Sequence, residues 1–158
     1  MRSLVIAIGL AGCWTGPAEH STLEPVPANE APRLKATPPL EGPFPAHTIW
    51  RGRYTCSQGD TAMQLTLDLA KGGRVIAIFD FGPLDSNPTV PAGSYRLIGH
   101  LDDRPEGLAL KLYPDRWISQ PDGYEMVELS AKSDRRRRHM RGTIDHYGCG
   151  ALSLDLVE

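Results

Sequence analysis

The stretch Met63-Gln64-Leu65-Thr66-Leu67-Asp68-Leu69, followed by the turn Ala70-Lys71-Gly72-Gly73, decides the fold of this 158-residue chain. Apolar and polar residues alternate strictly before the turn. After it, Val75, Ala77, Phe79 and Phe81 keep the same period and alternate with Ile76, Ile78 and Asp80. A period of two residues is typical of a half-buried β-strand, because successive side chains point to opposite faces. The stretch therefore predicts two antiparallel strands joined by a glycine turn.

The same period of two residues recurs along the rest of the chain. Turns rich in Gly, Pro and Asp separate the alternating segments, which span residues 49–54, 63–69, 75–81, 95–101, 108–112, 127–131, 140–144 and 152–156. No helical pattern of comparable length competes with them. Eight short strands at even spacing predict an all-β fold, a single antiparallel eight-stranded small barrel, with a β-sandwich as the alternative.

The cysteines help to choose between barrel and sandwich. Cys13 belongs to the N-terminal segment described below, so Cys56 and Cys149 remain as a pair. In an oxidising compartment such a pair predicts one disulfide. When an eight-strand meander closes, the end of strand one lies beside the start of strand eight, which is where these cysteines fall. A sandwich can also bring them together, and the other alternative is that Cys149 is a nucleophile.

The barrel topology sorts the loops to two ends. Loops after odd-numbered strands share one rim: the stretch after Cys56 and residues 82–93, 114–123 and 146–150. Long loops at one rim of a β scaffold are the usual place for binding. The candidate binding residues on this rim are Asn87, Asp115, Arg116, Trp117 and Gln120. An aromatic side chain flanked by charge suits an envelope protein or a glycan; the alternative is that Trp117 covers the barrel mouth as a lid.

The opposite end carries the charge run Arg135-Arg136-Arg137-Arg138. Four like charges in a turn are usually solvated, and the functional alternative is contact with anionic lipid headgroups. The formal net charge of the whole chain is only −2. With no basic stripe elsewhere, we expect no nucleic-acid partner.

The N-terminus has the pattern of a processing signal. Arg2 precedes a mostly apolar run, residues 3–10, that is far too short to span a bilayer. Leu10, the last residue of the run, begins the segment Leu10-Ala11-Gly12-Cys13, which resembles the lipobox of bacterial lipoproteins. The resemblance implies that residues 1–12 are removed and that Cys13 carries several acyl chains, which anchor a protein stably to a membrane. Because Trp14 stands where that class has its inner-membrane retention Asp, an organism with two membranes would place the protein on the outer one.

Between the anchor and the strands the chain is rich in proline and poor in apolar residues. Eight prolines lie between Trp14 and Thr48, with no hydrophobic period. This composition predicts a disordered tether with polyproline character. The predicted organisation is a lipoprotein signal peptide at 1–12, a lipidated tether at 13–48 and a β-domain at 49–158.

One resemblance bears on function. Tyr54-Thr55-Cys56 on the first strand, a second cysteine near the C-terminus and the lipobox together resemble membrane-bound inhibitors of c-type lysozyme. Members of that family are small β-barrel lipoproteins, and the resemblance implies a rim that inserts into an enzyme cleft. Their Ser-Gly segment followed by Tyr has a rearranged counterpart here, Ala92-Gly93-Ser94-Tyr95.

Catalysis has one candidate arrangement. His146 and Cys149 supply a base and a nucleophile close in sequence, and Gly148-Cys149-Gly150 resembles part of the motif of cysteine L,D-transpeptidases. The histidines show no metal-ligand spacing, so we expect neither a metal nor another cofactor. The sequence therefore favours a lipid-anchored, extracytoplasmic, non-catalytic binding module of the cell envelope. The alternatives are a periplasmic lysozyme inhibitor and a cell-wall cysteine hydrolase or transpeptidase.

The anchor can be tested by replacing Cys13. We expect Cys13→Ser to block lipidation and either release the domain or leave an unprocessed precursor, because the modified atom is the cysteine sulfur. Fractionation of cells grown with labelled palmitate measures both effects. A wild-type chain that takes up no label would contradict the anchor.

Overall fold

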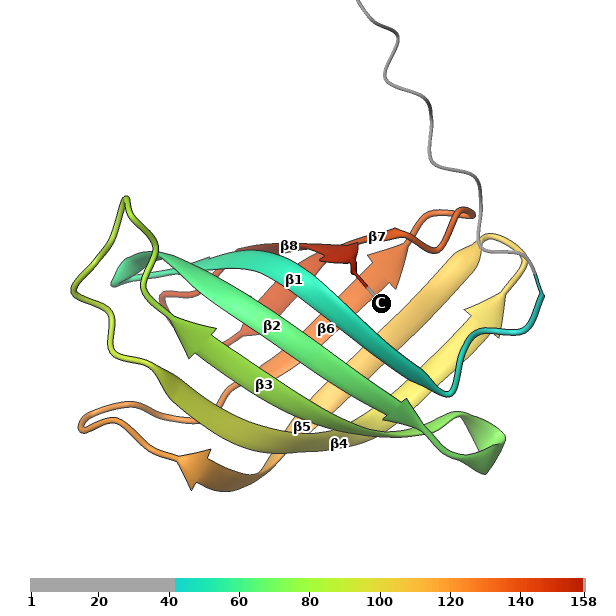
Figure 1. Ribbon diagram of the computed structural model, residues 1–158, viewed down its shortest axis with the longest axis horizontal. Helices are drawn as coiled ribbons and strands as arrows, with labels where there is room; N and C mark the ends of the chain where they lie inside the picture. The colour runs from blue at the N-terminus through green and yellow to red at the C-terminus, as the bar shows by residue number, and fades with distance from the viewer. Residues whose placement is uncertain (1–41, 158) are drawn as a thin grey trace, which may run out of the picture. The chain divides into compact units, whose positions relative to one another are not determined.

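Eight antiparallel strands follow one another around a closed barrel (Figure 1). The computed structural model describes residues 42–157. The strands are β1 His47–Cys56, β2 Gly59–Leu69, β3 Arg74–Gly82, β4 Gly93–Arg104, β5 Gly107–Ser119, β6 Glu128–Ser133, β7 His139–Asp145 and β8 Ala151–Leu156. A short 3-10 turn, η1 Lys71–Gly73, joins β2 to β3, with positive φ at Gly72 and Gly73. The predicted all-β fold and this glycine turn are confirmed.

The barrel closes by pairing the last strand with the first. β8 runs antiparallel to β1, with Trp50 opposite Leu156 and Tyr54 opposite Leu152. Each strand of the described barrel therefore has a hydrogen-bonded neighbour on both sides, which leaves no open edge for another chain to extend. The eight-stranded barrel is confirmed, and the sandwich that the sequence left open is excluded.

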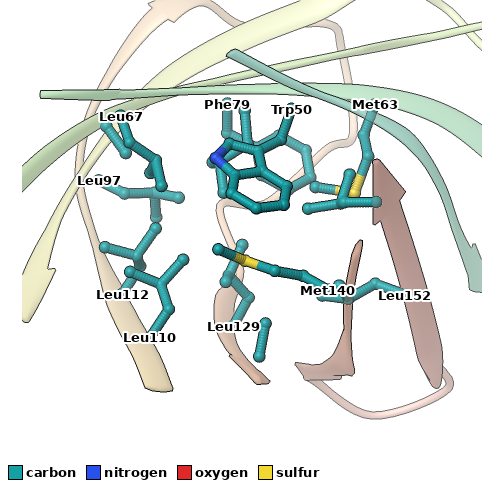
Figure 2. Close-up of a cluster of buried hydrophobic side chains, with 14 of the residues drawn as sticks. Trp50, Met63, Leu67, Phe79, Leu97, Leu110, Leu112, Leu129, Met140 and Leu152 are labelled. Carbon is teal, nitrogen blue, oxygen red and sulfur yellow. The ribbon is translucent and has the colours of Figure 1, made fainter. Parts of the chain in front are cut away.

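Side chains fill the barrel interior, so the interior is a packed core (Figure 2). Trp50, Phe79, Leu97, Leu112 and Met140 are all fully buried. An eight-stranded barrel is just wide enough to be filled by its own side chains. The alternation in the sequence supplies one such inward side chain at every second residue.

Three inward positions in the middle of strands carry glycine instead of a large side chain. Gly52, Gly99 and Gly142 each lie an even number of residues from the buried side chains of their strand, so they face the barrel interior. A Cβ at any of them would overlap a backbone carbonyl of the neighbouring strand, that of Ser153, Lys111 and Ser130 respectively. Glycine in a strand interior marks such close backbone approach and the bends of small barrels. These glycines therefore allow the strands to coil tightly enough to close.

Phe44 and Trp50 fill the end of the barrel at which the described chain enters, which we call the proximal end. Their rings stack at a centroid distance of 6.4 Å, and the indole N–H of Trp50 donates to the hydroxyl of buried Thr48 at 3.0 Å. β1 begins at His47. Residues 44–48 thus pack with the folded domain, and β1 begins two residues before the predicted strand start at Ile49.

The disulfide joins Cys56 to Cys149, 93 residues apart. Cys56 is the last residue of β1, and Cys149 lies two residues before β8. Beside it the amide of Gly150 donates to the carbonyl of Thr55 at 2.8 Å. The predicted pairing is confirmed, and it fastens the β1–β8 seam where the hydrogen-bonded ladder ends.

The N-terminal predictions lie outside the described residues. They concern the signal peptide, Cys13 and all but the last residues of the tether. Within residues 42–157, no helix is long and apolar enough to cross a membrane.

Breaking the bridge should destabilise the barrel without changing its fold. A ring of this size is worth about 4–5 kcal/mol in the chain-entropy model. We therefore expect reduction to lower the melting temperature by roughly 10 °C or more. Circular dichroism melts of oxidised and reduced chain, with Cys56→Ser/Cys149→Ser as the reagent-free control, measure this. Free thiols at both positions in the unfolded, unreduced wild type would refute the pairing.

Candidate functional site

Four connections gather at the end of the barrel away from the chain entry, which we call the distal rim. They are the β1–β2 turn (57–58), the β3–β4 loop (83–92), the β5–β6 loop (120–127) and the β7–β8 loop (146–150), on the left in Figure 1. The antiparallel meander places every connection after an odd-numbered strand at this end. The predicted sorting of the loops is thus confirmed.

One predicted loop begins later than expected. β5 continues to Ser119, so residues 114–119 are strand and only residues 120–127 form the loop. Pro114 lacks a backbone N–H and interrupts the alternation, which made the segment resemble a loop. The structure accommodates it by two register shifts against β4, between Ser94 and Tyr95 and between Arg96 and Leu97. Such bulges are common near the rims of barrels.

A cavity of about 440 Å³ opens at the distal rim. We call it the mouth cavity. Its lining comes from β1, β3, β4 and the rim loops, and comprises Tyr54, Cys56, Ser57, Gln58, Phe81, Tyr95, Gly123, Tyr124, Glu125, Val127, His146, Tyr147 and Cys149. This volume lies within the range of small-ligand sites, which combine aromatic walls with a few polar groups.

Stacked and tilted aromatic rings separate the mouth cavity from the packed core. Phe79 stacks on Tyr95 at 4.8 Å between ring centroids, and Phe81 stacks on Tyr124 at 5.5 Å. Trp117 meets Tyr95 edge-on at 5.1 Å. Aromatic pairs at these separations are favourable beyond the area that they bury. The floor of the cavity therefore consists of aromatic rings that pack against one another.

Two tyrosine hydroxyls give this floor its polarity. Burial raises the pKa of Tyr54 to about 12, against the opposing effect of hydrogen bonding with Thr61 and Gln58. Burial also raises the pKa of Tyr95, whose hydroxyl donates to the carbonyl of Val127 at 3.2 Å. Both groups are therefore neutral at physiological pH. The Tyr95 hydroxyl also accepts from the amide of Val127 at 3.4 Å, and neither tyrosine supplies a negative charge or a ready base.

The lip of the cavity is polar and carries one fully exposed aromatic ring. His146 places Nδ1 2.9 Å from the carbonyl oxygen of Tyr147 and Nε2 3.3 Å from a carboxylate oxygen of Glu125. Both neighbours are acceptors, so only the protonated imidazole donates to both. Tyr147 is 98% exposed. The distal rim also carries the exposed acids Asp85, Asp122, Glu125 and Asp145.

The predicted rim residues have mostly structural partners. Asn87 donates through Nδ2 to the carbonyls of Gln58 and Asp60, at 2.7 and 3.1 Å, and so ties the β3–β4 loop to the β1–β2 turn. Asp115 pairs with Arg96 at 2.6 Å on the outer wall. Gln120 donates to the carbonyl of Tyr124 within its own loop.

Trp117 and Arg116 both lie on β5. Trp117 packs against Phe81 and Tyr95, in keeping with the lid alternative, while Arg116 is exposed. Neither residue lines the mouth cavity.

The sequence missed the tyrosines that form the cavity. Tyr54, Tyr95, Tyr124 and Tyr147 lie on four different elements and share no spacing. The sequence singles out Tyr54 and Tyr95 only through the family resemblance and the strand pattern, and neither indicates a shared cavity. The one local signal was an aromatic residue beside a turn glycine, Tyr147-Gly148, which is typical of an exposed loop tip.

The catalytic alternative needs a free thiol at Cys149, and the structure has none there. The sulfur of Cys149 is bonded to that of Cys56, and a disulfide sulfur is not a thiolate nucleophile. Within residues 42–157, no three His, Cys, Asp or Glu side chains group closely enough to hold a metal ion.

No protein-family model, curated protein or solved structure matches this chain.

The packing of Trp117 yields a stability prediction. Complete burial makes Trp→Ala cost about 3–5 kcal/mol, and the half-buried Trp117 should cost about 2 kcal/mol. The neighbouring Ile118 is 58% exposed, and Ile118→Ala should cost about 0.5 kcal/mol or less. Urea unfolding of both variants measures the difference. An unchanged stability in Trp117→Ala would contradict the structural role and restore Trp117 as a candidate anchor.

Proposed function

We propose that this protein is a non-catalytic binding module of the cell envelope and that it binds its partner at the mouth cavity. The observation that carries the proposal is an open cavity of about 440 Å³ beside a tyrosine whose side chain contributes nothing to the core. A cavity and a projecting ring together can hold a protruding group of a protein or of a glycan.

The chemistry of the cavity suits a polar partner with an apolar face. Tyr124 and Phe81 offer ring surfaces, while the hydroxyl of Tyr54 and the amide of Gln58 offer hydrogen bonds. Sugars and aromatic or long side chains present both kinds of group. Tyr and Trp anchors dominate binding at many interfaces because they bury a large area at low entropic cost.

The acidic lip favours a cationic partner. Exposed carboxylates around a cavity attract positive charge and raise the rate of encounter. The opposite end has the opposite character, because it carries the exposed Arg135 and Arg136. A basic protein would therefore approach the mouth more readily than the chain-entry end.

The position of the mouth fits a tethered protein. Gly42, the first described residue, accepts a hydrogen bond from Arg137 of the β6–β7 turn at 3.1 Å. The chain thus enters the domain at the proximal end, opposite the mouth. If Cys13 is lipidated as predicted, the segment that leads to the anchor joins the domain at the end opposite the mouth.

Lysozyme inhibition is the second candidate function. It rests on the resemblance in sequence, and the projecting, acidic rim is the kind of surface that such an inhibitor inserts into an enzyme cleft. The segment Ala92–Tyr95 cannot serve as the inserted element, because Tyr95 is buried and Ser94 donates to Asp80 at 2.6 Å. Tyr147 and the β7–β8 loop would have to take its place.

Photo-crosslinking from the rim tests the proposal. A benzoylphenylalanine at Tyr147 should crosslink a partner in cells, whereas the same residue at Tyr113, 45% exposed on the outer wall, should not. With the purified partner, Tyr147→Ala should weaken binding at least tenfold, as expected for an aromatic anchor. Tyr113→Ala is the matched control and should change affinity less than twofold.

The outcomes separate the candidates. Crosslinks from Tyr113 alone, or equal effects of the two alanine variants, would overturn the mouth as the binding site. A c-type lysozyme assay addresses the alternative: inhibition by wild type that Tyr147→Ala abolishes would favour the inhibitor, and full enzyme activity at saturating protein would exclude it.

A further inference from the structure

A second cavity lies on the outer wall of the barrel, away from the mouth. Its volume is about 420 Å³, and β4, β5, β6 and β7 line it. We call it the wall groove. The strand register explains its position, because two neighbouring rows of outward residues cross these strands: His100 opposite Lys111 opposite Ser130, and Asp102 opposite Ala109 opposite Lys132 opposite Arg141. None of these residues has a role in the fold interior.

Small residues make the groove hollow. Ala109 and Ser130 are small side chains that point outward between longer neighbours, and Gly142, at an inward position, contributes only its backbone. The backbone of β7 also approaches β6 closely at Gly142, where a Cβ would overlap the carbonyl of Ser130. The floor is therefore low, and the side chains of Lys111, Lys132 and Arg141 stand around it.

The groove carries excess positive charge. Within residues 42–157, no carboxylate lies within salt-bridge distance of Lys111, Lys132 or Arg141. The contacts that they do make keep their charge: Lys111 lies over the ring of Tyr113 at 5.3 Å, and Arg141 donates to Nε2 of His139 at 3.0 Å.

The one acid in the groove, Asp102, already has partners for its charge. Asp102 accepts from Arg104 and from His100, both at 2.8 Å. The hydrogen bond from Arg104 lowers the pKa of Asp102, so the carboxylate stays ionised and held by these partners. It is therefore not available to balance the two lysines and Arg141 on the other side of the groove.

We propose that the wall groove binds a phosphate ester, with the phosphate between Lys111, Lys132 and Arg141 and the organic part over Ala109 and Gly142. Lysine and arginine are the residues that bind phosphate, through charge-assisted hydrogen bonds to its oxygens. The mostly uncharged floor suits a small organic group. The ester is either a soluble molecule or the headgroup of a lipid, since both present the same chemistry.

Two probes distinguish these sources. Glycerol 1-phosphate represents the soluble ester, and vesicles of phosphatidylglycerol in phosphatidylcholine present glycerol phosphate as the diester of a lipid headgroup. The protein is the full chain carrying Cys13→Ser, so that the predicted anchor does not attach it to vesicles. Amide NMR shifts follow the first probe, and flotation follows the second. Glycerol and pure phosphatidylcholine vesicles are the uncharged and the zwitterionic control.

A matched pair of variants assigns binding to the groove. Lys111→Gln/Lys132→Gln removes two exposed charges from the groove, and Arg135→Gln/Arg136→Gln removes two from the nearby β6–β7 turn. The groove variant should weaken binding at least tenfold, and the turn variant less than twofold. Shifts for glycerol 1-phosphate should centre on Ala109 and Gly142. All four substitutions are exposed, so thermal melts should stay within a few degrees of wild type.

Each result decides the proposal. Binding of either probe that only the groove variant loses supports it, and the probe that binds identifies the soluble or the lipid source. Equal losses in the two variants would mean general charge attraction and would overturn it. Loss in the turn variant alone would move the contact to the β6–β7 turn, and no binding of either probe would also overturn it.

Discussion

The pairing of β8 with β1 is the constraint on which the rest of the structure depends. Closing eight strands gives an interior that side chains alone fill, so every second residue must be apolar and of the right size. It also requires strands to bend sharply. Gly52 and Gly142 lie inward near the seam, opposite Leu154 and Leu152, and let the backbone of the next strand come into contact. Larger residues there would hold the neighbouring strands apart.

Closure makes the two ends of the barrel different. Phe44 and Trp50 fill the proximal end, while the distal end remains open as the mouth cavity. The disulfide fastens the seam at this open end, where Cys56 and Cys149 line the cavity. A bridge at the mouth keeps two of the rim elements, β1 and the β7–β8 loop, at a fixed separation. The site thus rests on the same covalent bond that stabilises the fold.

The strands were predictable because alternation is a local property. Residues 63–69 show it without interruption, and the cysteine positions were sufficient to favour a barrel. The continuation of β5 was not predictable, because Pro114 and the register shifts against β4 break the parity on which that inference relies. The mouth tyrosines and the basic residues of the groove were hidden for a different reason. Lys111, Lys132 and Arg141 meet only through cross-strand register, which the sequence does not display.

The loops around the mouth cavity are held in place by hydrogen bonds, and this affects the affinity expected for the proposed partner. Asn87 fixes the β3–β4 loop to the β1–β2 turn, and the hydroxyl of Tyr95 holds the β5–β6 loop at Val127. Loops that are already ordered lose little entropy when a partner arrives, so more of the contact energy appears as affinity. Tyr147 is the exception, because its exposed ring must be immobilised on binding. The wall groove, by contrast, is built on paired strands, so a ligand there need not disturb the rim. Under the two proposals, a partner at the mouth and a phosphate ester in the wall groove could therefore be bound at the same time.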